Sequence, residues 1–129
     1  MSFKAFVLFA KFSEKKERWQ KIARDACKQS GNPWLPKLDD PVSLNDALSQ
    51  TQGDDCWIGS LCDERIKLSP KPSNRTVSIF IGPEGGWTEE EEENALKAEF
   101  SFFTLGIHVL RMETAAISAL AVARQHMLC

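Results

Sequence analysis

A glycine-rich turn between an apolar strand and an acidic helix constrains the fold of this chain more than any other segment. Residues 76–81, TVSIFI, are β-branched and apolar enough to form a buried strand. The turn GPEGG follows at residues 82–86, and Thr88 stands three residues before Glu91, the spacing of a capping box at a helix start. The segment therefore predicts backbone amides at the carboxyl end of a strand, where open α/β sheets bind ligands.

A second glycine loop near the end of the sequence repeats this arrangement. A strand is expected over residues 100–105, the loop LGIHVLRMETA spans residues 105–115, and an alanine-rich helix is expected from about residue 113 to 126. Glycines admit a ligand against bare backbone, and the leucines supply apolar cover. Two such loops favour a small-molecule site, whereas an isolated GPEGG loop is equally explained as a tight turn without a ligand.

The rest of the chain alternates strands with helices, which favours an α/β fold with a mainly parallel sheet and helices on both faces. Its first strand is apolar on both faces and is therefore expected in the centre of the sheet. The expected elements are a strand over 3–12, a helix over 14–30 capped by Ser13 and stopped by Gly31, a short helix over 43–50, a strand over 56–61, a polar loop over 63–75 and a helix over 88–99.

Length and composition predict one domain, residues 1–129, with a sizeable core, because 43% of its 129 residues are hydrophobic. No apolar run is long enough to cross a membrane. The cysteines form no C-x-x-C pair, and neither His108 nor His126 lies near Cys56 and Cys62 in the sequence, which argues against a metal site. Their pattern predicts reduced thiols in a cytoplasmic protein; the four are Cys27, Cys56, Cys62 and Cys129.

Charge is distributed unevenly along the chain. Residues 1–75 hold 13 Lys and Arg against 10 Asp and Glu, whereas residues 76–129 hold 3 against 8. A basic front half suits contact with nucleic acid, and it is equally explained by a lysine-bearing surface helix. The turn at residues 82–86 lacks both the lysine of a phosphate-binding loop and the G-x-G-x-x-G spacing, and glutamates follow it. These features favour a ligand without phosphate.

The two loops carry a family resemblance. IGPEGGWTEEE and LGIHVLRMETA resemble the signature loops of the RsmE family, SPOUT-class methyltransferases that act on N3 of a uridine in 16S ribosomal RNA. ERWQKIA, CKQSG and LP, at residues 17–23, 27–31 and 35–36, resemble the family's helix and following extended segment. The resemblance covers nearly the whole chain from about residue 15. It implies a C-terminal trefoil knot and the cofactor S-adenosylmethionine.

Motif matching also implies the site residues. Arg111 is the candidate for stabilising an anion on the uridine, since a guanidinium can meet a uracil carbonyl. Glu84 is either a base or orienting group or a cap for local amides. The implied cofactor contacts are Gly82, Gly85 and Gly86 on one wall, Leu105, Gly106, Val109 and Leu110 on the other, and Leu61 at the end of the preceding strand.

The resemblance implies further partners and has three departures. The implied partners are ribosomal RNA or the small ribosomal subunit, and a second copy of the chain in a homodimer. The alanine-rich helix either packs against this second copy or packs on the sheet of its own chain. The chain has Ile107-His108 where the family has Pro-Arg, and Met112 where it has a small residue. His108 either contacts substrate or is solvated.

The third departure is length, because the family's N-terminal RNA-binding barrel has no counterpart in residues 1–129. The chain is thus expected to be a shortened methyltransferase domain. The alternatives are a cofactor- or RNA-binding module without turnover, and a small α/β nucleotide-binding or scaffold protein.

Overall fold

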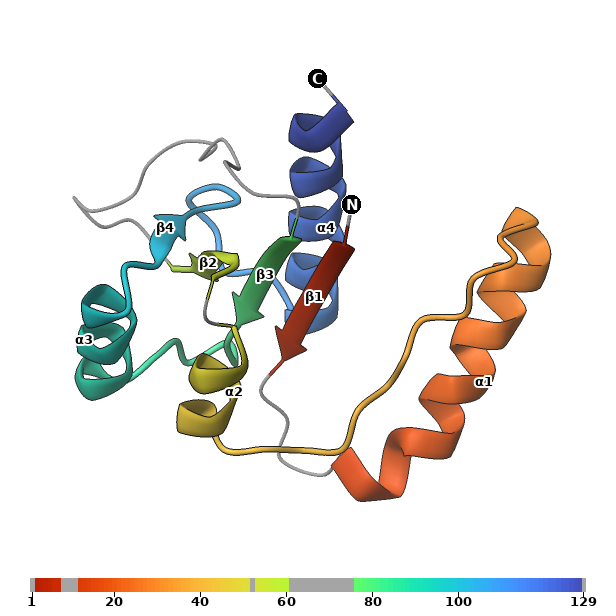
Figure 1. Ribbon diagram of the computed structural model, residues 1–129, viewed down its shortest axis with the longest axis horizontal. Coiled ribbons are helices and arrows are strands. Elements are labelled where there is room, and N and C mark those ends of the chain that lie inside the picture. The colour runs from red at the N-terminus through yellow and green to blue at the C-terminus, as the bar shows by residue number, and fades with distance from the viewer. Residues whose placement is uncertain (1, 8–11, 52, 61–75, 129) are drawn as a thin grey trace. The chain divides into compact units, whose positions relative to one another are not determined.

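A computed structural model describes residues 2–7, 12–51, 53–60 and 76–128. Its elements, labelled in Figure 1, are β1 (Ser2–Val7), α1 (Phe12–Ser30), α2 (Leu44–Gln50), β2 (Asp55–Gly59), β3 (Thr76–Ile81), α3 (Glu89–Lys97), β4 (Ser101–Phe103) and α4 (Met112–Leu128). The strand at 76–81 has its predicted bounds. The loop expected over 63–75 lies outside the described residues.

The four described strands form one parallel sheet in the order β1-β3-β2-β4. Phe80 of β3 pairs with Phe6 of β1 on one side and with Ile58 of β2 on the other. The prediction of a parallel sheet is confirmed. The central position expected for the first strand is wrong, because β1 lies at an edge of the described sheet. Apolar residues on both faces of a strand indicate that helices cover the sheet above and below it. They do not indicate whether the strand has a neighbouring strand on each side.

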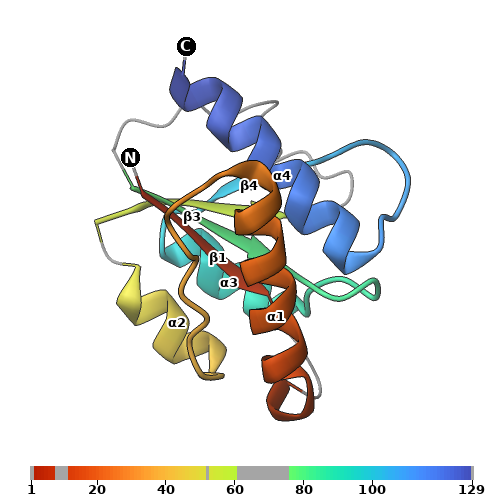
Figure 2. The same ribbon diagram turned by 90° about the vertical axis from the view of Figure 1, so that its right-hand side faces the viewer.

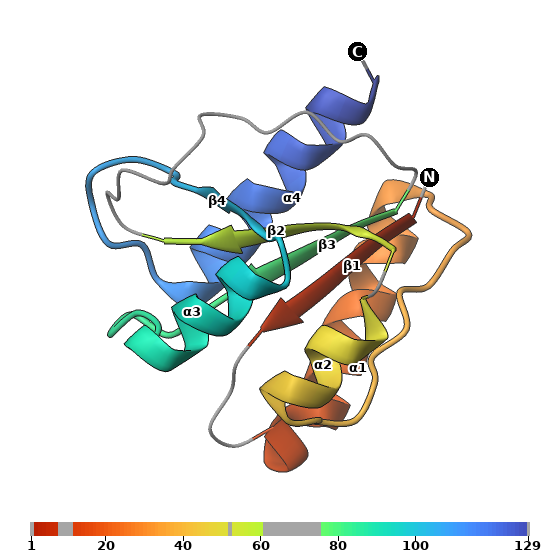
Figure 3. The same cartoon turned by 60° about the vertical axis from the view of Figure 1, so that its left-hand side comes forward.

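The sheet is covered by helices on both faces, as predicted. Alternate residues of β3, among them Ile79, pack with Trp57 and with Ala119 and Ala123 of α4, all nearly inaccessible to solvent. On the opposite face, Phe80 packs against Phe100, with ring centroids 4.9 Å apart. Figures 1 and 3 show α4 on one side of the sheet and α2 and α3 on the other. Alanines in α4 let the helix approach the strands closely.

Helix α3 begins with the predicted capping box. The Glu91 backbone N–H donates to the Thr88 hydroxyl at 3.2 Å, and the Thr88 N–H donates to the Glu91 carboxylate at 2.8 Å. The helix stops through Glu99, whose φ of 61° is in the left-handed region, so that the Phe100 N–H returns to the Ala95 carbonyl. This turn sends the chain directly into β4.

Residue contacts divide the chain into two compact units, one of Met1–Leu8 with Asn45–Cys129 and one of Phe9–Leu44. The second unit holds α1 and an extended segment that runs back alongside it in Figure 2. Within this unit, an ion pair between Lys16 and Asp40 joins α1 to the extended segment. The hydrogen bond and the charge of Lys16 lower the pKa of the Asp40 carboxyl.

The limits of several expected elements were wrong. The described first strand is Ser2–Val7, and Phe12, which was expected in this strand, belongs to α1. Ser13 therefore lies inside this helix and is not its cap, since an apolar residue in a first helical turn cannot be told from the end of an apolar strand. The described cysteines, Cys27 and Cys56, are not joined in disulfides. Within the described residues, no helix has the length and hydropathy to cross a membrane.

Candidate functional site

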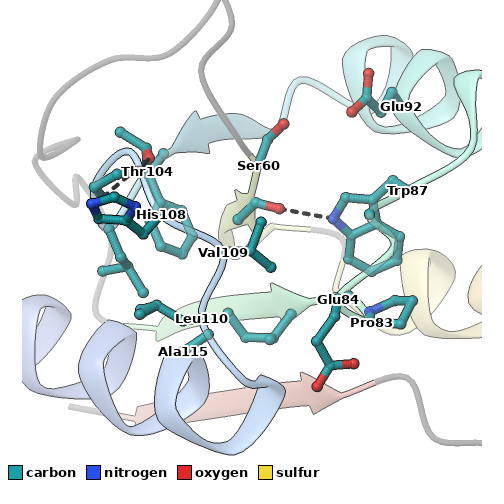
Figure 4. Close-up of a pocket in the computed structure, with 17 residues that line it drawn as sticks. Ser60, Pro83, Glu84, Trp87, Glu92, Thr104, His108, Val109, Leu110 and Ala115 are labelled. Carbon is teal, nitrogen blue, oxygen red and sulfur yellow. Dashed lines mark hydrogen bonds between the residues drawn. The ribbon is translucent and has the colours of Figure 1, made fainter.

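The turn after β3 is built around a tryptophan. Gly86 closes the turn by donating its N–H to the Pro83 carbonyl at 2.9 Å, with a φ of 81° that favours glycine. Trp87 then donates its indole N–H to the Gly59 carbonyl at 2.8 Å, the dashed bond in Figure 4. A Cβ on Gly82 would stand 2.9 Å from this indole. Gly82 therefore makes room for Trp87, which forms a wall of the site.

The hydroxyl of Thr104 stabilises the loop that follows β4. The Thr104 side chain accepts a hydrogen bond from the Gly106 N–H at 3.2 Å and donates one to the Gly106 carbonyl at 2.8 Å. Gly106 has a φ of 126°, which an L side chain rarely adopts. Arg111 ends the loop, and its carbonyl accepts the Ala115 N–H at 2.9 Å as α4 begins.

Glu84 connects the two loops. Its carboxylate accepts a hydrogen bond from the backbone N–H of Met112 at 3.4 Å. Met112 is the first residue of α4, and a carboxylate at a helix N-terminus is favoured by the helix dipole. Of the alternatives for Glu84, the capping contact is present, and the amide that it caps belongs to the other glycine loop. Glu84 thereby links the turn after β3 to the start of α4.

A pocket of ≈ 280 Å³ opens between these loops, at the carboxyl ends of β2, β3 and β4. The chain leaves β3 toward α3 on one face and leaves β4 toward α4 on the other, which is the topological position where α/β sheets bind ligands. In Figure 4, His108 and Thr104 lie on one side of the pocket, and Trp87 and Pro83 lie on the other.

Most of the residues expected at the site line this pocket. The predicted lining residues are Gly82, Glu84, Gly86, Leu105, Gly106, Val109 and Leu110. Gly85 and Arg111 are exposed and are not among the lining residues. Arg111 directly follows the lining residue Leu110 in the chain. Leu61 lies outside the described residues.

The pocket also contains residues that sequence reasoning did not select, among them Gly59, Ser60, Trp87, Glu92, Phe103 and Thr104. Trp87 had a local signal, because an aromatic residue directly follows the glycine turn. Gly59 and Ser60 had none, since only the pairing of β2 with β3 and β4 brings the end of β2 to this place.

The described lining of the pocket is acidic. Among the lining residues that the structure describes, the carboxylates of Glu84 and Glu92 are charged, and none of these residues is Lys or Arg. A cationic or neutral ligand therefore suits the pocket better than a phosphate, in line with the sequence-based interpretation. Across the described ranges, no three His, Cys, Asp or Glu side chains gather in a group that could hold a metal ion.

The fold and pocket define an α/β ligand-binding domain with its site between two glycine loops. More particularly, the chain belongs to the RNA methyltransferase domain family, whose model matches residues 4–124. It is similar to the ribosomal RNA small subunit methyltransferase E of Synechocystis, with 36% identity over 115 residues that cover 83% of this chain and 37% of the relative. The resemblance to the RsmE family is thereby confirmed.

Two further relatives agree. The enzyme of the same name from Bacillus subtilis is 33% identical over 120 residues, covering 86% of this chain and 47% of the relative. A crystal structure of ribosomal RNA small subunit methyltransferase E from Neisseria gonorrhoeae bound to S-adenosyl methionine matches with a TM-score of 0.78 and 32% identity, over 92% of this chain and 52% of that one. The chain thus spans about half, or less, of the length of these relatives.

Proposed function

We propose that this chain is the catalytic domain of an S-adenosylmethionine-dependent RNA methyltransferase that methylates N3 of a uridine in 16S ribosomal RNA. The observation that carries the proposal is the pocket between the two glycine loops. Support comes from the family match over residues 4–124 and from a similar structure that was crystallised with S-adenosyl methionine. The relatives' shared name points to small-subunit ribosomal RNA as the substrate.

The chemistry of the pocket fits this cofactor. Leu105, Val109 and Leu110 offer apolar cover for an adenine, and the glycine loops offer backbone amides and carbonyls. The carboxylates of Glu84 and Glu92 favour a cation, which suits a sulfonium. When bound, S-adenosylmethionine supplies an electrophilic methyl group for transfer to nitrogen.

Arg111 is the residue that we assign to the substrate. N3 of uridine carries a proton at neutral pH, so methylation requires that the anion left on the uracil be stabilised. Arg111 is exposed and directly follows the pocket-lining Leu110 in the chain, and its planar guanidinium can donate hydrogen bonds to a uracil carbonyl. Glu84 acts as an orienting residue in this scheme, because its carboxylate accepts the Met112 N–H.

The family membership also supports proposals about assembly. We propose that residues 1–129 form a single methyltransferase domain with a C-terminal trefoil knot, and that it works as a cytoplasmic homodimer. Exposed apolar side chains on α4 and the loop before it support the dimer, with Ile117 70% and Ile107 78% exposed. Sedimentation of the purified chain tests the dimer, and an experimental structure tests the knot.

Calorimetry tests the cofactor. We expect S-adenosylmethionine and S-adenosylhomocysteine to bind the chain and ATP not to bind, because the described part of the pocket lining offers carboxylates and no Lys or Arg to a triphosphate. If neither methionine derivative binds, the proposed function is wrong, and tight ATP binding would favour the nucleotide-binding alternative.

A methyl-transfer assay tests the reaction. Small ribosomal subunits that lack the methylation serve as substrate, and Arg111→Ala is compared with Arg124→Ala, which removes an exposed arginine far along α4. We expect Arg111→Ala alone to lower the rate at least about 100-fold, the usual effect of removing an anion-stabilising donor. Full activity of Arg111→Ala would refute the role of Arg111. Cofactor binding without transfer by the wild type would favour a binding module.

A further inference from the structure

The unit formed by Phe9–Leu44 differs in charge from the rest of the chain. It holds 8 Lys and Arg against 5 Asp and Glu, a net charge of +3, whereas the other unit has a net charge of −5. None of the described residues that line the pocket belongs to the basic unit. A positive unit in an RNA methyltransferase family member suits contact with the phosphates of the substrate.

Trp34 is the most exposed large apolar side chain that the structure describes, at 80%. An indole that is mostly exposed to water contributes little to folding, and its aromatic face is available for contact with a partner. It belongs to the segment Asn32–Pro33–Trp34–Leu35–Pro36, in which the two prolines fix their own φ angles.

Hydrogen bonds hold the backbone of Trp34 in place. Its N–H donates to the side-chain oxygen of Asn32 at 3.0 Å, and its carbonyl accepts the Cys27 thiol at 3.5 Å. The Asn32 N–H in turn donates to the Cys27 carbonyl at 3.0 Å, at the end of α1. The indole is thus presented on an ordered backbone, which lowers the entropy that a contact would cost.

Cations lie on the helix beside this segment. Arg24 stands one turn before Cys27 on α1, Lys28 follows Cys27 directly, and both side chains are exposed. Neither forms an ion pair with any residue that the structure describes, whereas Lys37 is paired with Asp39 at 2.7 Å. An exposed aromatic face next to available cations is the combination with which proteins bind single-stranded nucleic acid.

We infer that Trp34 is a stacking platform for a base of the substrate RNA, with Arg24 and Lys28 contacting the adjoining phosphates. The inference rests on the proposed function, because it identifies RNA as the partner of this surface. It places an RNA contact in the basic unit, outside the residues that line the cofactor pocket.

The test uses the full chain and a short fluorescein-labelled oligouridylate, with binding followed by anisotropy at low salt. Trp34→Ala should weaken binding roughly 5- to 100-fold, as expected for the loss of one stacked base. Trp34→Phe should retain most of the affinity, because it keeps an aromatic face. Leu35→Ala, which removes the neighbouring exposed side chain, should bind like the wild type. Replacing Arg24 and Lys28 by Gln should reduce the salt dependence of binding.

Further measurements separate this inference from the proposed function. Calorimetry should show equal affinity for S-adenosylmethionine in Trp34→Ala and in the wild type. If the wild type binds no cofactor, that result counts against the proposed function and not against the role of Trp34. Photocrosslinking with 5-iodouracil in the oligouridylate should label Trp34. The inference is overturned if the wild type does not bind the oligouridylate, if Trp34→Ala binds it as tightly, or if Trp34→Leu matches Trp34→Phe. A change in sedimentation of Trp34→Ala would also overturn it, in favour of a contact with a second copy.

Discussion

Replacing Gly82 by alanine should damage the pocket through Trp87. The added methyl would lie 2.9 Å from Cε2 of the indole, closer than real Cβ contacts come, and 3.2 Å from Cδ2 and Cζ2, which is tighter than most such contacts. The ring cannot withdraw without stretching its 2.8 Å hydrogen bond to the Gly59 carbonyl. Overpacking costs about 1–3 kcal/mol and loss of the hydrogen bond about 0.5–1.5 kcal/mol, so we expect the free energy of unfolding to fall by about 1.5–4.5 kcal/mol.

Urea unfolding and calorimetric titration with S-adenosylmethionine measure the two consequences. Because Trp87 lines the pocket, a displaced indole should weaken cofactor binding as well as folding. Gly85→Ala is the matched control in the same turn. A Cβ on Gly85 would meet no atom within 4 Å, and Gly85 lacks a positive φ, so this variant should be unchanged or more stable by up to about 1 kcal/mol.

The double variant with Trp87→Phe shows whether the indole is the cause. Phenylalanine is shorter and makes no bond to the Gly59 carbonyl, so Gly82→Ala should cost at least about 1 kcal/mol less in this background. The reasoning is refuted if Gly82→Ala is as stable as Gly85→Ala, or if the effects of Gly82→Ala and Trp87→Phe simply add.

Three further predictions concern helix ends. Glu84→Ala should weaken S-adenosylmethionine binding measurably, by about 1 kcal/mol, whereas Glu84→Gln keeps an acceptor for the Met112 N–H; equal affinities by calorimetry would contradict this. Thr88→Ala should lower the free energy of unfolding by about 1 kcal/mol and Thr88→Ser should not, since serine preserves the cap; urea unfolding distinguishes them. Glu99→Gly should raise the free energy of unfolding by about 1 kcal/mol, because glycine adopts the left-handed φ of this position without strain, and Glu99→Ala should not raise it. The melting temperatures of the two variants measure the difference.

The strand, turn and helix from residue 76 to 97 could be predicted because their signals are local. A β-branched run sets the strand, and Thr88 with Glu91 sets the helix start through two hydrogen bonds that involve only neighbouring residues. The same holds for Gly31, which ends α1 as predicted. Where the signal was apolar alternation alone, as over residues 3–12, the limit of the element was misplaced.

Strand order could not be predicted in this way, because pairing joins residues that are far apart in the chain. β3 inserts between β1 and β2, so the first strand is left at an edge of the described sheet. The same pairing brings Gly59 and Ser60 to the pocket. Their position depends on the strand order, and for that reason no motif at the end of β2 could have identified them.

The glycines of the two loops show most clearly what a motif leaves open. The sequence-based interpretation gave each of them one role, to admit a ligand against bare backbone. In the structure, Gly82 admits the indole of Trp87, whereas Gly86 and Gly106 adopt positive φ angles that turn the chain. One wall of the pocket is therefore a tryptophan that Gly82 accommodates. We therefore expect substitutions at Gly82 to change the pocket through this side chain, and those at Gly86 or Gly106 to change it through the course of the loop itself.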